Sequence, residues 1–233
     1  MAVSSIAAGA MIGGGAAPAH ATPTDVKPAA AHGATAPENA TEGGLDAVLA
    51  RCARSPGLSA RFVEERRIAL LAVPLRAEGT LHFAPGRGLV RHTTKPSRES
   101  VLVTEKEVVV WDGQKTRRLA LGGSKAVETF ARAFSLLLAA DRPALEKDFE
   151  LTYDRDEGRG DAPGGFRLRL VPRGTDLKKL VAAIEIEGRG LDIALLRVRE
   201  ANGDVSTTTF SGVDPAHRYS DVELEQLFRV PPR

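Results

Sequence analysis

The chain has 233 residues, of which 42% are hydrophobic and 27% are charged. This length suits one globular domain with flexible ends, since a single domain usually takes about 100–200 residues. Lysine and arginine total 32 and aspartate and glutamate total 30, so the formal charge is only +2. This balance, without any basic stripe along the chain, excludes the electrostatic pattern of a nucleic-acid-binding protein.

Residues 1–21 carry no charged side chain, are rich in Ala and Gly, and end in Ala19-His20-Ala21. An A-x-A ending of this kind predicts a secretory signal peptide, here without its basic n-region. A start codon assigned too far downstream would explain that absence, and a disordered Ala/Gly-rich leader is the alternative. The segment is too short and too rich in glycine to span a bilayer. We therefore expect an exported, periplasmic protein.

Residues 22–44 are rich in Ala, Thr and Pro and show no apolar period, which predicts a disordered linker. The folded domain is expected over residues 45–233. A first helix is predicted by an apolar face with helical spacing, formed by Leu45, Val48, Leu49 and Cys52. Cys52 is the single cysteine, which excludes an internal disulfide, and we expect it to be buried.

After Ser55-Pro56-Gly57 the apolar period changes from helical spacing to alternation, which predicts strands. The first strand is expected over residues 60–70. Further strands are expected over residues 76–83, 89–94, 100–104, 107–111 and 115–121. Asp112-Gly113 is a strong signal for a tight hairpin. Connections this short require antiparallel neighbours, because a parallel crossover needs a dozen or more residues.

Two helices are predicted next. Ser124 caps the first, whose wide apolar stripe is formed by Val127, Phe130, Ala131, Phe134, Leu137 and Leu138. Asp141, with Pro143 just inside, opens a shorter helix that runs through Lys147. Strands then resume over residues 149–155, 166–172, 183–187, 191–200 and 204–210, with Asn202-Gly203 in the last hairpin.

This order predicts an α+β fold, in which three short helices cover one curved antiparallel sheet of about 10–11 strands. The apolar stripes of the helices must bury against the sheet, because no other apolar surface is available to them. Where the helices cover the sheet loosely, a hydrophobic cavity remains, and interiors of this kind hold ligands.

Several stretches resemble the LolA family of periplasmic lipoprotein carriers. They are Phe62-Val63-Glu64-Glu65, Glu78-Gly79-Thr80-Leu81-His82-Phe83-Ala84-Pro85, Lys95-Pro96, Ser100-Val101-Leu102-Val103 and Val109-Val110-Trp111. The C-terminal half fits as well, through Phe166 to Pro172, the pair of strands around Asn202-Gly203-Asp204, and the closing Phe228-Arg229-Val230-Pro231-Pro232. A divergent branch of the family carries the run seen here from Arg66 to Leu71, followed by Pro74-Leu75 and Gly79.

The resemblance implies an unclosed β-barrel with helices as a lid over a hydrophobic cavity. Such carriers accept acylated cargo from an inner-membrane transporter and hand it to an outer-membrane acceptor, and we expect a monomer. The residues expected in the cavity wall or lid are Phe62, Leu81, Phe83, Val110, Trp111, Val127, Phe130, Phe134, Leu137 and Leu138. Typical members place an Arg-Pro lid latch where this chain has Pro85-Gly86, so Arg87 is the candidate latch.

Motifs of catalysis are missing: the chain has no G-x-S-x-G, H-E-x-x-H, Walker A or C-x-x-C. His82 and His92 are expected to be neighbours on adjacent strands, but a zinc site needs further ligands. The cluster Asp154, Asp156, Gly158 and Asp161 resembles a calcium loop whose twelfth position is Gly165 instead of Glu, which favours a solvated acidic hairpin loop.

We therefore expect a non-enzymatic protein with no metal and no cofactor, which carries the acyl chains of lipoproteins or of other lipidated cargo. Two alternatives stay open at this point. One is a regulatory module of the same fold that senses a lipidated partner. The other is a lipid-binding accessory to glycolipid or pigment-lipid assembly.

Overall fold

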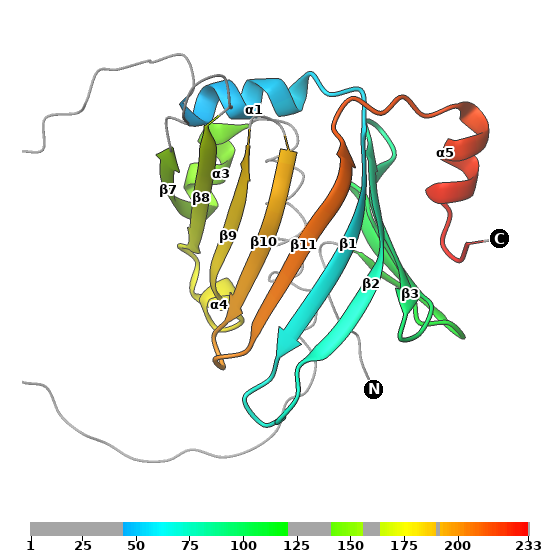
Figure 1. Ribbon diagram of the computed structural model, residues 1–233, viewed down its shortest axis with the longest axis horizontal. Helices are drawn as coiled ribbons and strands as arrows, with labels where there is room; N and C mark the ends of the chain where they lie inside the picture. The colour runs from blue at the N-terminus through cyan, green and yellow to red at the C-terminus, as the bar shows by residue number, and fades with distance from the viewer. Residues whose placement is uncertain (1–43, 121–140, 156–163, 190–191, 233) are drawn as a thin grey trace, which may run out of the picture.

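The computed structural model describes residues 44–120, 141–155, 164–189 and 192–232. Eleven strands form a single antiparallel sheet in the order β6-β5-β4-β3-β2-β1-β11-β10-β9-β8-β7 (Figure 1). The strands are β1 (Leu58–Arg67), β2 (Leu75–Ala84), β3 (Gly88–Lys95), β4 (Glu99–Val103), β5 (Glu107–Trp111), β6 (Thr116–Ala120), β7 (Phe149–Arg155), β8 (Gly165–Pro172), β9 (Val181–Arg189), β10 (Asp192–Glu200) and β11 (Val205–Asp214).

The two meanders of the chain meet where β1 pairs with β11, in the middle of the sheet. In the described part of the chain β6 and β7 end the strand order and do not pair with each other. The helices are α1 (Leu45–Ala53), α3 (Arg142–Asp148), α4 (Thr175–Lys178) and α5 (Asp221–Leu227). This architecture confirms the predicted α+β fold, an unclosed antiparallel barrel with a few short helices.

The strand register divides the side chains between two faces of the sheet, because paired residues share a face and neighbours along a strand alternate. We call the face that carries Phe62 the inner face. At its β7–β10 end, α1, α3 and α4 contribute apolar side chains to a buried cluster with the strands. That cluster contains Leu45, Leu49, Leu145, Phe149, Leu168, Leu170, Leu177, Val181, Ile184 and Ile186.

A second apolar cluster lies at the other end of the inner face, on β2 to β6. It contains the buried Leu89, Val101, Val103, Val108 and Val110, with Leu81, Phe83 and Leu119 packed against it. The opposite, outer face of β2 to β5 is covered by the C-terminal segment, residues 219–230, through Leu224, Leu227, Phe228 and Val230. Figure 1 shows the sheet strongly curved, with α5 outside the curve.

Most strands lie within two residues of their predicted bounds, and β5 and β7 have the bounds predicted for them. Other features differ from the prediction, and β11 runs to Asp214 instead of residue 210. The first strand ends at Arg67 instead of residue 70, the sequence did not predict α4 or α5, and Cys52 is only partly buried. Burial is nevertheless sufficient to raise the pKa of the Cys52 thiol.

Several predictions fall outside the described residues. They concern the leader and linker up to residue 43, the helix that begins at Ser124, and most of the acidic loop after Arg155. None of the helices in the described ranges combines the length and the hydrophobicity that a membrane crossing requires.

Candidate functional site

The middle of the inner face holds a buried ion pair. Arg91 on β3 pairs with Glu64 on β1, and their side chains are 6% and 3% exposed. The guanidinium carbon of Arg91 lies 4.1 Å from the centroid of the Phe62 ring, close enough for a cation–π contact. The hydroxyl of Ser206 on β11 donates to the second carboxylate oxygen of Glu64. These contacts offset part of the desolvation cost that two buried charges carry.

A second ionic group lies further along the same row of β1. Arg66 bonds Glu200 at 2.9 Å and approaches Asp204 at 3.7 Å. The other carboxylate oxygen of Asp204 accepts a hydrogen bond from the backbone N–H of Ala69 at 3.1 Å. Burial raises the pKa of Glu200, although Arg66 opposes the shift. The pair of ionic groups forms a polar band between the two apolar clusters.

Glu99 on β4 adds a titratable group to this band. Its strand partner is Thr93, and the alternation of β4 with buried Val101 places Glu99 on the inner face. Burial raises the pKa of Glu99 to about 7, against the pull of Arg91 and with help from Glu64. The inner face therefore presents two apolar areas and a polar centre, a combination suited to an amphiphile.

Five of the predicted cavity residues lie in described strands, and the sheet separates them. Phe62, Leu81, Phe83 and Val110 are on the inner face. Trp111 is on the outer face, in contact with the cluster under the C-terminal segment. The prediction that Val110 and Trp111 line one wall was wrong, because adjacent residues of a strand point to opposite faces. Whether the other four line a cavity stays a prediction.

The predicted lid residues Val127, Phe130, Phe134, Leu137 and Leu138 lie outside the described residues. Arg87, the candidate latch, follows the turn in which its N–H bonds Ala84 O at 3.0 Å. Its exposed side chain lines a pocket on the outer face. The buried arginine of the inner face is Arg91, which sequence reasoning missed. The sequence could have indicated its burial, because Arg91 follows Leu89 by two residues and therefore lies on the same, apolar face of β3.

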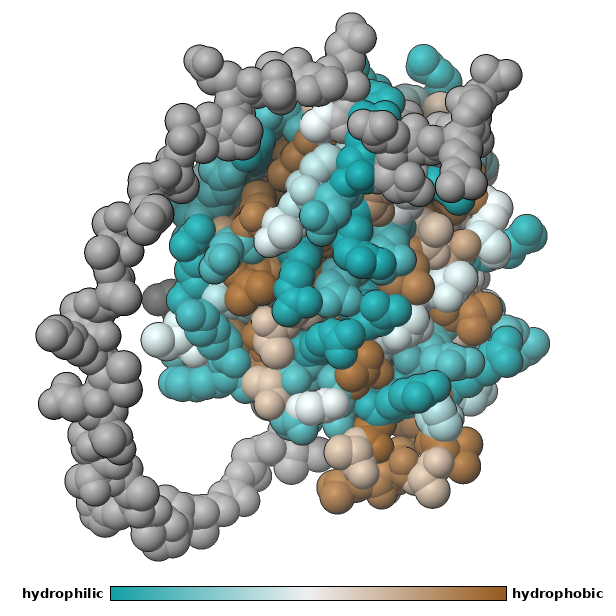
Figure 2. Space-filling view, turned by 60° about the vertical axis from the view of Figure 1, so that its left-hand side comes forward, coloured by the Kyte–Doolittle hydropathy of each residue, from teal (hydrophilic) through white to brown (hydrophobic). Residues whose placement is uncertain are grey.

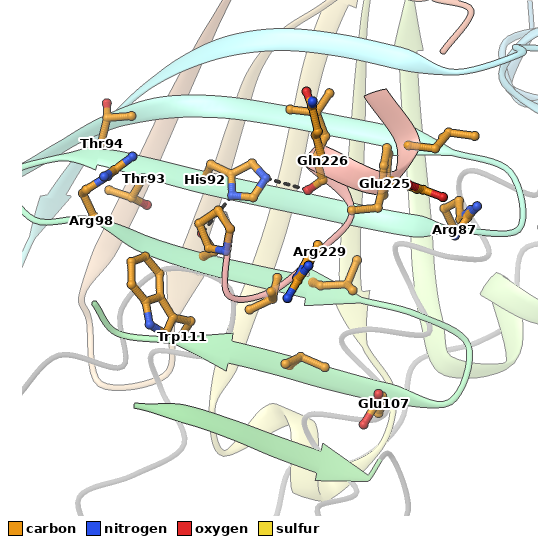
Figure 3. A pocket seen from close by; sticks show the side chains of 18 of the residues that line it. Arg87, His92, Thr93, Thr94, Arg98, Glu107, Trp111, Glu225, Gln226 and Arg229 are labelled. Atoms are coloured by element: carbon orange, nitrogen blue, oxygen red, sulfur yellow. Dashed lines mark hydrogen bonds between the residues drawn. The ribbon is translucent and has the colours of Figure 1, made fainter. Parts of the chain in front are cut away.

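The outer face carries a pocket of about 850 Å³ between β3–β6 and the C-terminal segment (Figure 3). Its floor includes Leu102, Val109 and Trp111. Arginines 87, 98 and 229 line it as well, and each has an exposed side chain. Part of the wall belongs to α5 and the tail that follows it, so the C-terminal segment both covers the sheet and shapes this pocket.

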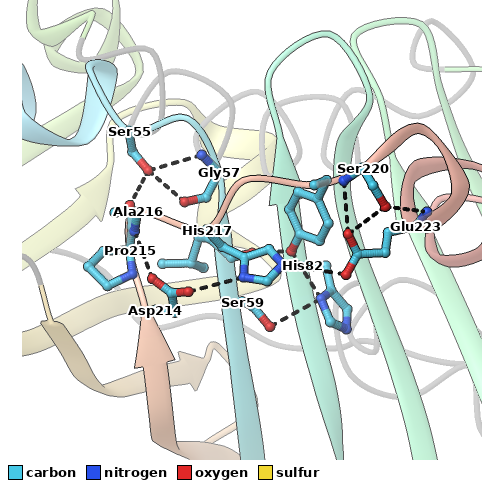
Figure 4. Close-up of polar contacts among 12 residues, drawn as sticks. Ser55, Gly57, Ser59, His82, Asp214, Pro215, Ala216, His217, Ser220 and Glu223 are labelled. Carbon is cyan, nitrogen blue, oxygen red and sulfur yellow. Dashed lines mark hydrogen bonds and ion pairs between the residues drawn. The ribbon is translucent and has the colours of Figure 1, made fainter.

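Histidines join the C-terminal segment to the outer face (Figure 4). The Tyr219 hydroxyl donates to Leu58 O at 2.7 Å, so its oxygen accepts from Nδ1 of His82 at 3.0 Å. His82 is 8% exposed. Burial lowers its pKa to about 4, and the neighbouring His92 contributes. This histidine is therefore neutral at physiological pH.

His92 makes a second connection. Its Nε2 donates to Leu227 O and its Nδ1 bonds the Ser100 hydroxyl, both at 2.8 Å (Figure 3). Burial lowers its pKa too. The centroids of the His82 and His92 rings are 6.2 Å apart, which confirms that the two are neighbours. In the described ranges no group of three or more His, Cys, Asp or Glu side chains is arranged to hold a metal.

The sequence is similar to that of a known protein family. The model of a family described as outer membrane lipoprotein carrier protein LolA-like matches residues 35–226. No curated protein matches the chain. A LolA superfamily protein from Nitrosomonas europaea has a similar structure, with 9% identity, coverage of 77% of this chain and 96% of that chain, and a TM-score of 0.41.

Two further solved structures are similar. A putative outer membrane lipoprotein-sorting protein domain from Vibrio parahaemolyticus has 9% identity, coverage of 81% and 99%, and a TM-score of 0.43. The MucA/MucB complex of Pseudomonas aeruginosa has 12% identity, coverage of 77% and 60%, and a TM-score of 0.41. Since the family model spans most of the sequence, the chain belongs to the LolA-like family of outer membrane lipoprotein carrier proteins.

Proposed function

We propose that this protein carries acylated cargo, a lipoprotein or another lipidated molecule, with the acyl chains held against the inner face. The observation that supports this role best is the pattern of that face. Two apolar clusters lie at the ends of one curved sheet surface, and a polar band separates them. An acyl chain would contact the apolar ends, and the polar part of the cargo would meet the band.

Partly exposed apolar side chains offer the contact. Leu81, Phe83 and Leu119 pack against the β2–β6 cluster without being buried, so each retains surface that a ligand would cover. Burying a methylene stabilises binding by about 0.8 kcal/mol, so ten buried methylenes contribute roughly 8 kcal/mol before the entropic cost of association. Binding of this kind requires no covalent step, and we propose that the protein is not an enzyme.

The expected A-x-A leader and the family together support a periplasmic location. In that compartment a carrier would receive its cargo from an inner-membrane transporter and release it to an outer-membrane acceptor. Both partners belong to the proposal. The nature of the cargo decides which acceptor is needed.

Displacement of a hydrophobic dye tests the inner face. Delipidated protein should bind the dye and release it to a diacylated peptide. Leu81→Gln, which puts an amide on the inner face, should lower the affinity for the dye and for the peptide by about tenfold each. Thr80→Gln is the matched control, because Thr80 is the next residue of β2 and points to the outer face.

Equal affinities for the two variants, or no displacement of the dye by the acylated peptide, would overturn the proposal. Native mass spectrometry of protein taken from its own periplasm identifies the cargo. An acylated molecule should co-purify with the native chain and be present at a lower fraction in the Leu81→Gln variant. A chain that is empty after gentle extraction would contradict the carrier role.

A further inference from the structure

The loop between β1 and β2, residues 68–74, is an exposed apolar tip. Its sequence is Ile68-Ala69-Leu70-Leu71-Ala72-Val73-Pro74. Leu70 is 93% exposed, Val73 72% and Leu71 49%, and Leu75, the first residue of β2, is 48% exposed. Figure 2 shows an apolar protrusion at the lower end of the molecule, where Figure 1 places this loop. Single exposed leucines are ordinary on protein surfaces, but a contiguous group marks an interaction site.

The base of the tip is fixed to the sheet. The N–H of Ala69 bonds the carboxylate of buried Asp204 at 3.1 Å, in the turn between β10 and β11. The N–H of Leu71 bonds Ile68 O at 2.9 Å, which closes a turn within the loop. Arg66, two residues before the loop, forms an ion pair with Glu200. These bonds fix the base of the loop. Its apolar side chains therefore point into solvent and do not pack against the sheet.

Cations flank the tip. Arg67 and Arg76 stand exposed on its two sides, and no acidic residue occurs between positions 66 and 77. Helix α4, which ends at Lys178 and is followed by Lys179, lies at the same end of the molecule (Figure 1). An apolar tip with basic residues around it complements a membrane surface, since the apolar side chains enter the acyl region and the cations meet anionic headgroups.

We propose that residues 68–75 form a membrane-contacting tip that inserts its leucines and Val73 into the surface of an anionic bilayer. The shape of the tip favours lipid over a protein partner. An ordinary protein interface buries about 800 Å² on each side and uses twenty or more residues. This tip is a narrow protrusion of eight residues, which a fluid bilayer accommodates without a complementary groove. The proposal does not depend on what the inner face carries.

Flotation with vesicles of phosphatidylethanolamine and phosphatidylglycerol, in roughly a three to one ratio, tests the tip on the full, delipidated chain. Combining Leu70→Ser with Val73→Ser should lower vesicle binding by at least about tenfold. Val222→Ser is the matched control, because Val222 is 63% exposed on α5, away from the tip. Since all three side chains are exposed, unchanged melting temperatures would confirm that the variants fold.

Insertion itself has an optical signature. The chain has one tryptophan, Trp111, so combining Trp111→Phe with Leu70→Trp places the only indole at the tip. Its emission should shift to the blue on addition of the vesicles. The Leu81→Gln variant should still bind vesicles, which separates this proposal from the carrier role. Vesicle binding that survives loss of Leu70 and Val73, an unshifted emission, or a tip that binds only an envelope protein would overturn the proposal.

Discussion

The buried ion pair of the inner face gives the sharpest test of the structure. Arg91→Met removes the charge that faces Glu64, whose side chain is 3% exposed, and leaves that carboxylate with Ser206. Breaking a buried pair in this way costs about 3–5 kcal/mol. The melting temperature should fall by about 10 °C for a chain of this size. Arg167→Met is the control, because Arg167 is 59% exposed and its pair with Glu187 is worth at most about 1 kcal/mol.

Removing both charges should restore stability. Combining Glu64→Leu with Arg91→Met replaces the pair with apolar side chains of similar size, a change that is about neutral in other proteins. Urea denaturation of the two single variants and the double variant gives the coupling energy directly, and we expect it to exceed about 3 kcal/mol. If each single substitution lowers the free energy of unfolding by less than about 1 kcal/mol, the pair is not buried as described. If the two single effects add up to the effect of the double substitution, the two charges do not depend on each other.

Three other changes test separate parts of the structure. Gly79→Ala should destabilise by more than about 2 kcal/mol, since its Cβ would lie 1.9 Å from His92 O, whereas Gly174→Ala meets no atom within 4 Å. Phe228→Ala should cost about 3 kcal/mol and make the C-terminal segment sensitive to protease. Acidification should destabilise the chain between pH 6.5 and about 4. In this range His82 is protonated in the unfolded chain but stays neutral in the folded one, because burial lowers its pKa from 6.5 to about 4. Calorimetry should show a flatter pH profile for His82→Gln, and an unchanged profile would contradict the assignment.

Alternation of apolar residues was sufficient to predict the strands because most of them bury one face of the sheet. The tip shows where that signal fails. Ile68 and Leu70 continue the apolar phase of β1, so the sequence predicts strand as far as residue 70. The strand ends at Arg67 because its partner β11 begins at Val205, opposite that residue. The length of a strand is thus decided by its neighbour, which lies far away in the sequence.

The sequence of helix α5 contains a helix-start motif that the strand prediction did not take into account. Ser220 and Glu223 form a capping box, and Leu224, Leu227 and Phe228 follow with helical spacing. The capping box predicts a helix start, but nothing local predicts that the helix covers the outer face. Arg91 was missed for a related reason. Its place on the inner face follows from the alternation of β3, but its burial depends on Glu64, a partner on another strand.

The inner face and the tip meet on β1, where the polar band lies between the tip and the apolar clusters. The inner row runs from Phe62 through Glu64 to Arg66 and then into the apolar tip. An acyl chain that moves from a membrane at the tip to the apolar clusters must therefore cross the polar band. Replacing Glu64 and Arg91 by Leu and Met removes the central charges, so this double variant should take up a fluorescent fatty acid from vesicles faster than the parent chain. A stopped-flow measurement of this uptake tests the route, because uptake at the parent rate would contradict passage across the polar band.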